Sequence, residues 1–281
     1  MPGKLVVIAT PLGHLDDLSP RAREALRDAD CIACEDTRRT AVLLARFQID
    51  TPLVSCHKFN ESARLEPLLR KLAEGRTVAL VSDAGTPGVS DPGALLVRAA
   101  IGAGHVVSPV PGPSAVTALL SVSGLPADRF LFEGFLPHRA GERRRVLRKL
   151  SGVDRPLVIY ETPHRIRDAL EDIRVILGER PLVLGRELTK LHETILHGTA
   201  AELLDALGPS PKGEIVLAIA PGDGTSVDDG TVERVRDTWR AELRASDGDR
   251  RNALKRTSKL SGIKRAELYR LLAELGEDID D

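Results

Sequence analysis

Short runs of branched and aliphatic residues alternate with amphipathic segments along most of this chain, and that alternation constrains the fold more than any other feature. Strands are predicted at residues 5–10, 31–35, 52–56, 77–82, 105–110, 156–161, 181–188 and 214–220. Helical patterns fill the stretches between them, and the first begins where Ser19 can cap and Pro20 suits the first helical position. Strands that alternate with helices predict an α/β protein.

The length of 281 residues suits two ordinary α/β domains, each with its own core. We place the first at residues 1–125 and the second at residues 126–222. The polar, glycine-rich stretch GDGTSVDDG follows Pro221, and every segment from Thr231 onward is helical in pattern. Residues 231–281 are therefore predicted to form a small third domain made only of helices.

Composition excludes several classes of protein. The formal net charge is −1, so the charge of the whole chain indicates neither a nucleic-acid nor a membrane partner. No apolar run approaches the roughly 20 residues that a membrane span needs, and three cysteines are too few for a disulfide framework. We expect a cytoplasmic protein without a membrane partner.

Cys31 and Cys34 have a spacing that zinc and redox sites use, but no second pair accompanies them, so we expect a buried strand and no metal.

Three glycine-rich stretches follow predicted strands. They are ATPLGHLDDLSP after the first strand, SDAGTPGVSDPG after the fourth and VPGPSAVTALL after the fifth. Glycine lets the backbone approach a ligand closely, and ligands of open α/β sheets bind where strands end and helices begin. Each stretch alone reads as an ordinary turn, but three of them favour one ligand crevice. The chain lacks both a dinucleotide fingerprint and a Walker lysine loop.

The order of the motifs resembles a known family. The motifs are TPLGHLDDLSPRA, EDTRRT, LVSDAGTPGVSDPG, PVPGPSAVTALLSVSGLPADRFLFEGFLP, YETPHR and RELTKLHETI. Together they are similar to the tetrapyrrole-methylase-type S-adenosylmethionine transferases, and within them to the branch that methylates the ribose 2′-hydroxyl of a decoding-centre cytidine in 16S ribosomal RNA. The similarity runs from about Lys4 to Pro221 and is most specific from Val110 to Pro137. One departure is His14, which stands where this branch usually has Asn.

This resemblance implies a two-lobed fold that binds S-adenosylmethionine in a folded conformation between two α/β lobes. It also implies a homodimer that acts on 16S RNA of the small ribosomal subunit. The implied cofactor contacts are Pro11, Asp83, Ala84, Gly85, Thr86, Val89, Ser90, Ser114 and Ala115. Asp91 has two alternative roles, as a ligand contact or as the cap of the helix that begins near Pro92, and the cap is the favoured one.

Methyl transfer to a ribose hydroxyl needs alignment and a base, because the hydroxyl is a poor nucleophile. We favour Glu187 and Lys190 as the catalytic residues of the acceptor site. If residues 181–188 form a regular strand, Arg186 and Leu188 share one face and Glu187 points to the other. The alternative role for Glu187 and Lys190 is a surface ion pair at a strand end.

Other polar groups offer further candidates. The motif YETPHR supplies Glu161, His164 and Arg165 as possible acceptor-site groups. The stretch HKFNE, which begins at His57, also resembles the RNA-methylating branch. The alternative interpretation of His57 is a structural role. The sequence leaves the identity of the base open.

Two segments of the chain are strongly basic although its net charge is small. Arg139–Lys149 contains six basic residues against one acidic residue, and Arg250–Arg270 contains eight basic residues around a turn at Ser261 and Gly262. The second stretch reads as helix-turn-helix-like, which presents basic side chains to phosphates. The candidate RNA contacts are Arg143, Arg144, Arg145, Arg148, Arg251, Lys255, Arg256, Lys264 and Arg265. A charge run alone is usually a solvated face.

Two alternatives to the RNA methyltransferase stay open. One is a corrin or porphyrin methylase that acts on a small molecule and has no need of basic C-terminal helices. The other is a non-catalytic nucleic-acid-binding protein in which the helix-turn-helix binds and the α/β lobes sense a ligand. Cofactor binding separates the second alternative from both enzymes.

Overall fold

The structure is a computed structural model that describes residues 3–222 and 229–279, so most of the predicted linker lies outside the described residues. The chain divides into two compact units. Unit 1 consists of Met1–Ala118 and Glu187–Thr194, and unit 2 consists of Leu119–Arg186 and Ile195–Asp281. The domain boundaries expected from the sequence stay predictions.

Unit 1 contains a parallel five-stranded sheet. Its strands are β1 (Lys4–Ile8), β2 (Cys31–Cys34), β3 (Leu53–Ser55), β4 (Thr77–Val81) and β5 (Val106–Val110), in the order β3-β2-β4-β1-β5. Every neighbouring pair in this order is parallel. The carboxyl ends of all five strands therefore lie at one edge of the sheet, which is where ligands bind in folds of this class.

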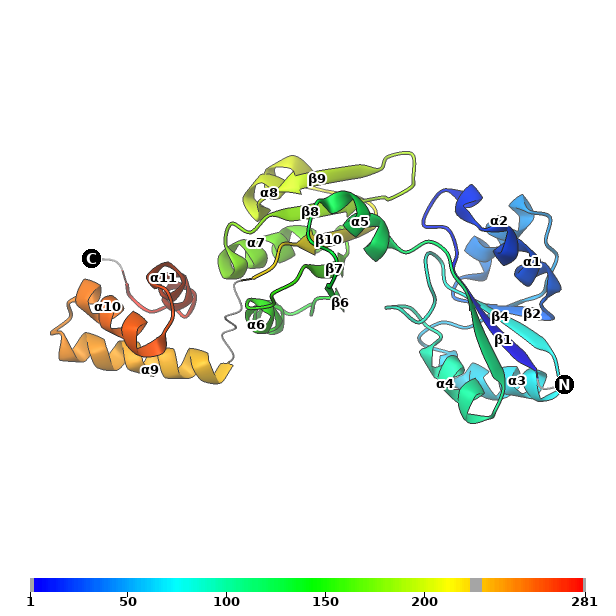
Figure 1. Cartoon of the computed structure of the whole chain (residues 1–281), viewed down its shortest axis with the longest axis horizontal. Helices are drawn as coiled ribbons and strands as arrows, with labels where there is room; N and C mark the ends of the chain where they lie inside the picture. The colour runs from blue at the N-terminus through cyan, green and yellow to red at the C-terminus, as the bar shows by residue number, and fades with distance from the viewer. Residues whose placement is uncertain (1–2, 223–228, 280–281) are drawn as a thin grey trace. The chain divides into compact units, whose positions relative to one another are not determined.

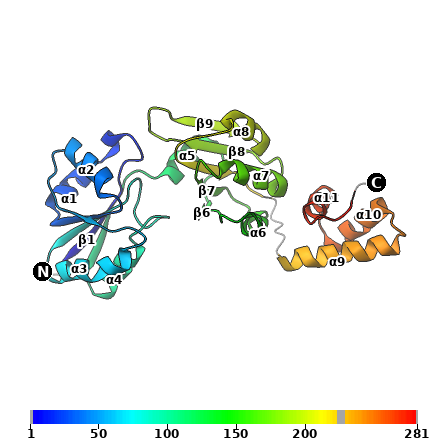
Figure 2. The ribbon, with the colours of Figure 1, turned by 180° about the vertical axis from the view of Figure 1, so that it is seen from behind.

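Helices cover both faces of this sheet (Figures 1 and 2). The short η1 (Leu15–Asp17), α1 (Pro20–Asp28) and α2 (Thr37–Arg46) lie on one face, and α3 (Glu61–Ala73) and α4 (Ala94–Gly102) lie on the other. Alternation along β1 explains the two cores, because Val6 and Ile8 pack with α1 and α2 while Leu5 packs with α3 and α4. Ser19 caps α1 as predicted, by accepting the Ala22 N–H.

The cysteines are part of these cores. Cys31 and Cys34 are buried in β2, as the sequence indicated, and Cys56 is buried directly after β3. Burial is the main cause that raises the pKa of the Cys56 thiol, to about 11. The thiols are packing groups at neutral pH, since the thiolate is the reactive form.

Unit 2 contains a second five-stranded sheet of mixed direction. The strands are β6 (Leu131–Phe135), β7 (Leu157–Glu161), β8 (Leu182–Arg186), β9 (Thr194–Gly198) and β10 (Ile215–Ile219), in the order β6-β7-β10-β8-β9. The helices of this region are α5 (Ala115–Ser123), α6 (Ala140–Leu150), α7 (Ile166–Leu177) and α8 (Ala200–Leu207). The predicted α/β class is confirmed for both sheets.

Three helices end the chain: α9 (Asp229–Ala245), α10 (Arg250–Ser261) and α11 (Arg265–Glu274). They pack around Trp239, which is fully buried with Ala253 and Leu268. The turn between α10 and α11 passes through Gly262 at a φ of 72°, a left-handed conformation that glycine adopts without strain. The helix-turn-helix pattern is therefore present as predicted.

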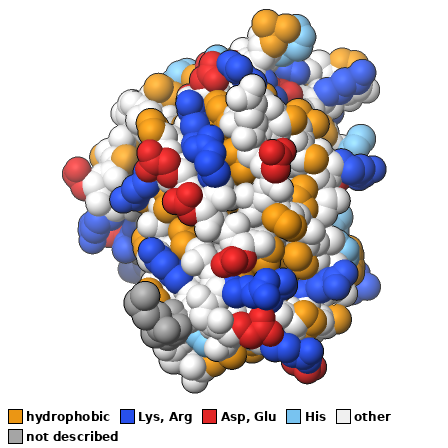
Figure 3. Space-filling model, turned by 90° about the vertical axis from the view of Figure 1, so that its right-hand side faces the viewer, with side chains coloured by type: hydrophobic (Ala, Val, Ile, Leu, Met, Phe, Trp, Pro, Cys, Tyr) orange, Lys and Arg blue, Asp and Glu red, His pale blue; other side chains and the backbone are white. Residues whose placement is uncertain are grey.

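Charges of both signs are mixed on the face seen in Figure 3, in accord with the small net charge. Among the described residues, no helix is both long and apolar enough to span a bilayer.

Candidate functional site

The three glycine-rich loops of unit 1 are joined by hydrogen bonds at the carboxyl edge of the first sheet. Thr10 and Gly85 exchange backbone hydrogen bonds of 2.8 and 3.0 Å, which link the loops after β1 and β4. The hydroxyl of Thr86 donates to the Pro113 carbonyl at 3.4 Å, which adds the loop after β5. All the predicted cofactor contacts lie on these three loops, so the structure brings them into one unit.

The backbone of these loops is unusual in two ways. Gly85 and Gly88 have φ values of 77° and 80°, and Ser90 has a φ of 64° although it has a side chain. A non-glycine residue in this region stores strain that often marks a functional loop. A Cβ atom at Gly112 would lie 3.1 Å from the Ala9 Cβ, so close packing of β1 against the 110–115 loop also requires glycine.

The helix after the β4 loop is capped by a residue that the sequence analysis did not consider. Gly93 is the N-cap of α4, and Glu61 Oε1 accepts the N–H groups of Gly93, Leu95 and Leu96 at 3.0, 3.0 and 3.3 Å. The preference for Asp91 as the cap was therefore wrong. A buried carboxylate from α3 takes that role because it satisfies several otherwise unpaired donors at once.

Asp83 connects the loop after β4, which is the predicted cofactor loop, to the loop after β2. Its Oδ1 accepts the Asp36 N–H at 3.0 Å, and its Oδ2 lies 3.3 Å from the Arg39 guanidinium. Burial, and then the charge of Asp83, raise the pKa of the neighbouring Glu35 carboxyl. Arg38 hydrogen-bonds to Asp36 and holds the pKa of that carboxyl well below its usual range. The EDTRRT motif is thus an ordered set of charges beside the cofactor loop.

Residues 187–194 belong to unit 1, although they connect two strands of the second sheet. The predicted strand at 181–188 is wrong beyond Arg186, where β8 ends, because Glu187 and Thr189 have φ values of 53° and 65°. The face assignment made for Glu187 from strand alternation fails for the same reason. The segment is a strained turn instead of a strand end.

This turn packs on the loop after β1. The Thr189 hydroxyl accepts the His14 N–H at 3.1 Å, and a side chain at Gly13 would collide with the Lys190 stem. Lys190 Nζ lies 2.9 Å from Glu187 Oε1, and both side chains are about one-quarter exposed. The two predicted catalytic residues are therefore held together in the unit that contains the cofactor loops.

Unit 2 uses its polar candidates differently. Glu161 is buried and receives two hydrogen bonds from Arg165, at 2.8 and 2.7 Å, and Arg165 also donates to the Leu136 carbonyl. This closed ion pair joins β7 to the start of α7. Both groups are occupied within unit 2, in a contact that stabilises the fold.

Two predicted RNA contacts are also used by the fold. Arg143 is buried, and its Nε donates to Asp172 at 2.6 Å; a buried guanidinium offers no surface to RNA, so its assignment is corrected to a structural one. Arg148 is mostly buried and pairs with Glu274 of α11 at 3.1 Å. The other seven side chains are exposed: Arg144, Arg145, Arg251, Lys255, Arg256, Lys264 and Arg265. Of these, Arg144 also pairs with Asp172 and Arg256 with Glu242.

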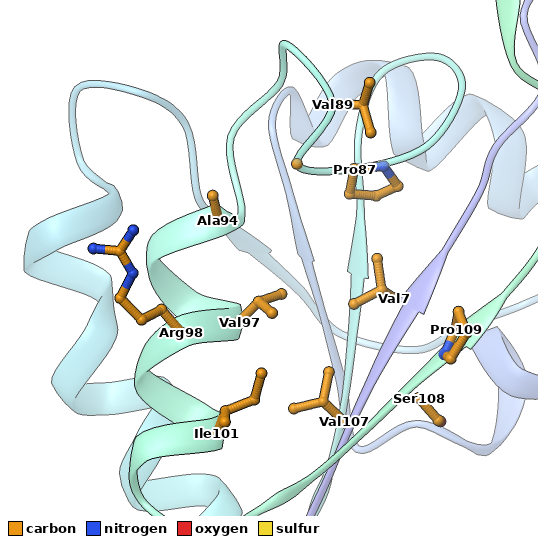
Figure 4. A pocket seen from close by; sticks show the side chains of 11 residues that line it. Val7, Pro87, Val89, Ala94, Val97, Arg98, Ile101, Val107, Ser108 and Pro109 are labelled. Carbon is orange, nitrogen blue, oxygen red and sulfur yellow. The ribbon is translucent and has the colours of Figure 1, made fainter. Parts of the chain in front are cut away.

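An apolar groove lies beside the cofactor loop in unit 1 (Figure 4). Its volume is about 550 Å³, and its walls come from β1, β5, α4 and residues 87–89. The predicted cofactor contact Val89 lines it, together with Val97, Ile101 and Val107. Arg98 and Ser108 are the polar residues of the lining, which offers little to the amino and carboxylate groups of S-adenosylmethionine.

Comparison with known proteins identifies the family. The model of the Tetrapyrrole (Corrin/Porphyrin) Methylases matches residues 4–204. The chain belongs to this family. The predicted membership, and with it the predicted methyltransferase class, are confirmed.

Members of the family that are similar to this chain differ in length. A ribosomal RNA small subunit methyltransferase I from Xylella fastidiosa is 46% identical over 95% of this chain and 98% of its own. One from Thermotoga maritima is 44% identical over 78% of this chain and 98% of its own. A uroporphyrin-III C-methyltransferase structure from Thermus thermophilus, in complex with S-adenyl homocysteine, is 21% identical and superimposes with a TM-score of 0.55, over 76% of this chain and 96% of that one. This likeness supports the predicted fold.

Two parts of the site escaped the sequence analysis. Glu61 acts on a helix that begins more than 30 residues later, and no local pattern reports such a contact. Thr189 lies in the motif RELTKLHETI, but its bond to the His14 backbone depends on a turn where the sequence pattern predicts a strand. The positive φ values at Glu187 and Thr189 could not be predicted from the composition, because neither residue is glycine.

Proposed function

We propose that this chain transfers the methyl group of S-adenosylmethionine to the ribose 2′-hydroxyl of a decoding-centre cytidine in 16S ribosomal RNA. The observation on which this depends is the joining of the three glycine-rich loops to the Glu187–Lys190 turn within one unit. The similarity to ribosomal RNA small subunit methyltransferases I supports the choice of ribosomal RNA over a small molecule.

The residues of the three loops fit the cofactor. The positive φ of Gly85 lets the backbone approach a flat adenine or a compact sulfonium closely, and the Asp83 carboxylate suits a cationic or hydroxyl group. Pro11, Ala84, Thr86, Val89 and Ser90, with Ser114 and Ala115, would complete the contacts. When bound, S-adenosylmethionine supplies a methyl group on a leaving group that departs without protonation.

The chain's own residues then have two tasks. They hold the acceptor oxygen in line with the methyl carbon, and they manage the proton and charge of the hydroxyl as the new C–O bond forms and the C–S bond breaks. Glu187 would take the hydroxyl proton, and Lys190 would stabilise the negative charge that develops on the oxygen. Hydrogen bonds of Thr189 to the His14 N–H and to the Glu193 carboxylate hold the turn that carries this pair.

Replacing the pair tests this assignment. Glu187→Gln and Lys190→Ala should each lower kcat by about 100-fold or more, the contribution of one positioned acid-base group, and leave the cofactor Kd unchanged. Glu171 and Arg174 of α7 are a matched control, because they form another pair three residues apart, at 2.8 Å, on an exposed surface. If Glu187→Gln and Glu171→Gln have the same activity, Glu187 and Lys190 are only a surface ion pair.

The RNA substrate would be bound in part through the exposed basic residues of α6, α10 and α11. Purified protein, labelled S-adenosylmethionine and small subunits that lack the modification test this, followed by nuclease mapping of the label. Label on a decoding-centre ribose supports the proposal. Cofactor binding without label on RNA would favour a corrin or porphyrin methylase, and absence of cofactor binding would favour the non-catalytic alternative.

The proposed enzyme works as a homodimer in the cytoplasm. Three buried free thiols suit a reducing compartment. The apolar groove supports a second copy as partner, since it lies at the edge strand β5, where Val106 is 50% exposed and Ile101 of α4 is 61% exposed. Ile101→Glu should shift the mass in solution from dimer to monomer, whereas Val175→Glu on α7 should not. Equal masses for the two variants would contradict this interface.

A further inference from the structure

Phe59 is the most exposed aromatic side chain of the described residues and lies in unit 1, in the turn between β3 and α3. It is 93% exposed, so it contributes almost no buried area to the fold. Large apolar side chains in such positions often mark contacts with partners. Neither the cofactor loops nor the Glu187–Lys190 turn gives Phe59 a role.

Hydrogen bonds hold the turn that presents Phe59. Asn60 Oδ1 accepts the His57 N–H at 2.7 Å, and Asn60 Nδ2 donates to the Ser55 carbonyl at 3.3 Å. His57 Nδ1 accepts the Phe59 N–H at 3.2 Å, and the two rings are in edge-to-face contact with their centroids 6.2 Å apart. An aromatic ring on an ordered turn loses little entropy when a ligand stacks on it.

Exposed cations lie at the same edge of the sheet. β2 and β3 pair in parallel, with Cys34 opposite Ser55, so the residues that follow them emerge at neighbouring positions. The side chains of Arg38 and Arg39, at the start of α2, are 89% and 62% exposed, and Lys58 beside Phe59 is also exposed. Asp36 and Asp83 hold the two guanidinium groups in fixed orientations without covering them.

The same groups are joined to the cofactor loop. Asp83, which binds Arg39 and the Asp36 N–H, is itself one of the proposed cofactor contacts. The charge of Asp83 raises the pKa of the Glu35 carboxyl, and the charge of Arg39 lowers it. On the far side of the turn, Glu61 caps α4 directly after the cofactor loop. The turn that carries Phe59 is therefore joined, through Glu61, to the helix that follows the loop that would bind S-adenosylmethionine.

We infer that Phe59 is a stacking platform for one unpaired base of the RNA substrate, close in the chain to the methylated ribose, with phosphate bound by Arg38 and Lys58. An open aromatic face flanked by cations suits single-stranded RNA, whose bases are free to stack, whereas a duplex hides the faces of its bases. This inference rests on the proposed function. It adds an RNA contact in unit 1 to those proposed in α6, α10 and α11.

The test compares four substitutions in the full chain, with small subunits that lack the modification as substrate. Phe59→Ala should raise the KM for RNA by roughly 5- to 150-fold, the range that stacking of one base contributes, with kcat and the cofactor Kd unchanged. Phe59→Trp should retain the wild-type KM and Phe59→Leu should not, because stacking needs a π face. The control Val175→Ala removes an exposed apolar side chain from α7 and should have no effect.

A second readout is independent of activity. Trp239 is the single tryptophan of the chain and is buried, so Phe59→Trp adds one exposed fluorophore. Titration with a short single-stranded RNA should quench its fluorescence, and the same RNA as a duplex should quench it less.

The outcomes separate the two proposals. A wild-type KM in Phe59→Ala, or an unquenched Phe59→Trp, would overturn the platform while the methyltransferase stands. Wild-type behaviour of Phe59→Leu would also overturn it, since an apolar contact with a ribosomal protein would then explain the exposure. If the wild-type protein methylates no RNA, the proposed function fails, and the fluorescence titration still decides whether Phe59 binds a base.

Discussion

The two units use charged residues in opposite ways. At the carboxyl edge of the first sheet, Arg38, Arg39 and Lys190 pair with carboxylates but keep exposed surface that a ligand can contact. In unit 2, Arg143 with Asp172 and Arg165 with Glu161 are buried pairs closed by hydrogen bonds. These pairs therefore differ in burial: the unit 1 pairs keep surface that a ligand could contact, and the unit 2 pairs are closed into the fold.

The largest effect that tests this comparison is the loss of a buried pair in unit 2. Asp172→Ala leaves Arg143 buried without a counter-charge and should lower the free energy of unfolding by about 3–5 kcal/mol. Asp168→Ala, on the exposed face of the same helix, should change it by about 0.5 kcal/mol. Urea denaturation of both variants measures the difference, and equal values would show that the pair does not lock the fold.

In unit 1 a substitution in the glycine-rich loops should lower the affinity for S-adenosylmethionine. Gly85→Val forces a β-branched residue to a φ of 77°, at a cost of about 1–3 kcal/mol, and distorts the loop that would contact the cofactor. Calorimetry with S-adenosylmethionine should show affinity reduced at least about 10-fold. Gly102→Ala is the control, because a Cβ there has nothing within 4 Å. Wild-type affinity in a well-folded Gly85→Val protein would refute the loop assignment.

Glu61 tests whether a buried carboxylate of unit 1 also stabilises the fold, as the buried pairs of unit 2 do. Glu61→Ala leaves three backbone N–H groups of α4 without their acceptor and should cost about 1–3 kcal/mol of unfolding free energy. Glu61→Gln keeps an acceptor oxygen and should recover part of it. Glu66→Ala on the exposed side of α3 should have an effect near zero. If Glu61→Ala matched this control, the cap would have no energetic role.

The smallest effect concerns the thiols. Because burial raises the pKa of Cys56 from 9.0 to about 11, its thiol ionises first in the unfolded chain as the pH rises. The free energy of unfolding should not depend on Cys56 below pH 9 and should fall from there towards pH 11. At pH 8 iodoacetamide should leave the folded protein unmodified by mass spectrometry and should alkylate all three cysteines in urea. Rapid alkylation of the native protein would show that these cysteines are accessible.

Much of the fold was predictable because its central strands are continuous apolar runs. β4 and β10 read clearly in the sequence, since both are almost completely buried. The two strands that were missed, β6 and β9, are the outer strands of the second sheet. β6 has a bulge between Phe132 and Gly134, and β9 has no fully buried residue, so neither shows a regular apolar pattern.

The site was predictable to the extent that it lies in glycine-rich loops at strand ends. The loops around Gly85 and Pro113 were recognised from composition, and their joining follows from a parallel sheet. What composition could not show is which charges the fold buries. Arg143 and Arg144 are adjacent in one basic run, yet Arg143 is buried and Arg144 is exposed, because only one of two neighbours on a helix can face the core.

The membership of Glu187–Thr194 in unit 1 also has a consequence for biosynthesis. During translation the first sheet and its glycine-rich loops are synthesised early. The turn that packs on Gly13 and His14 is synthesised only after β6, β7 and β8 of the second sheet. The nascent chain can therefore assemble the cofactor loops well before it holds Glu187 and Lys190. Competence for the proposed methyl transfer would therefore arrive late in translation, once this turn has been added to the proposed cofactor loops.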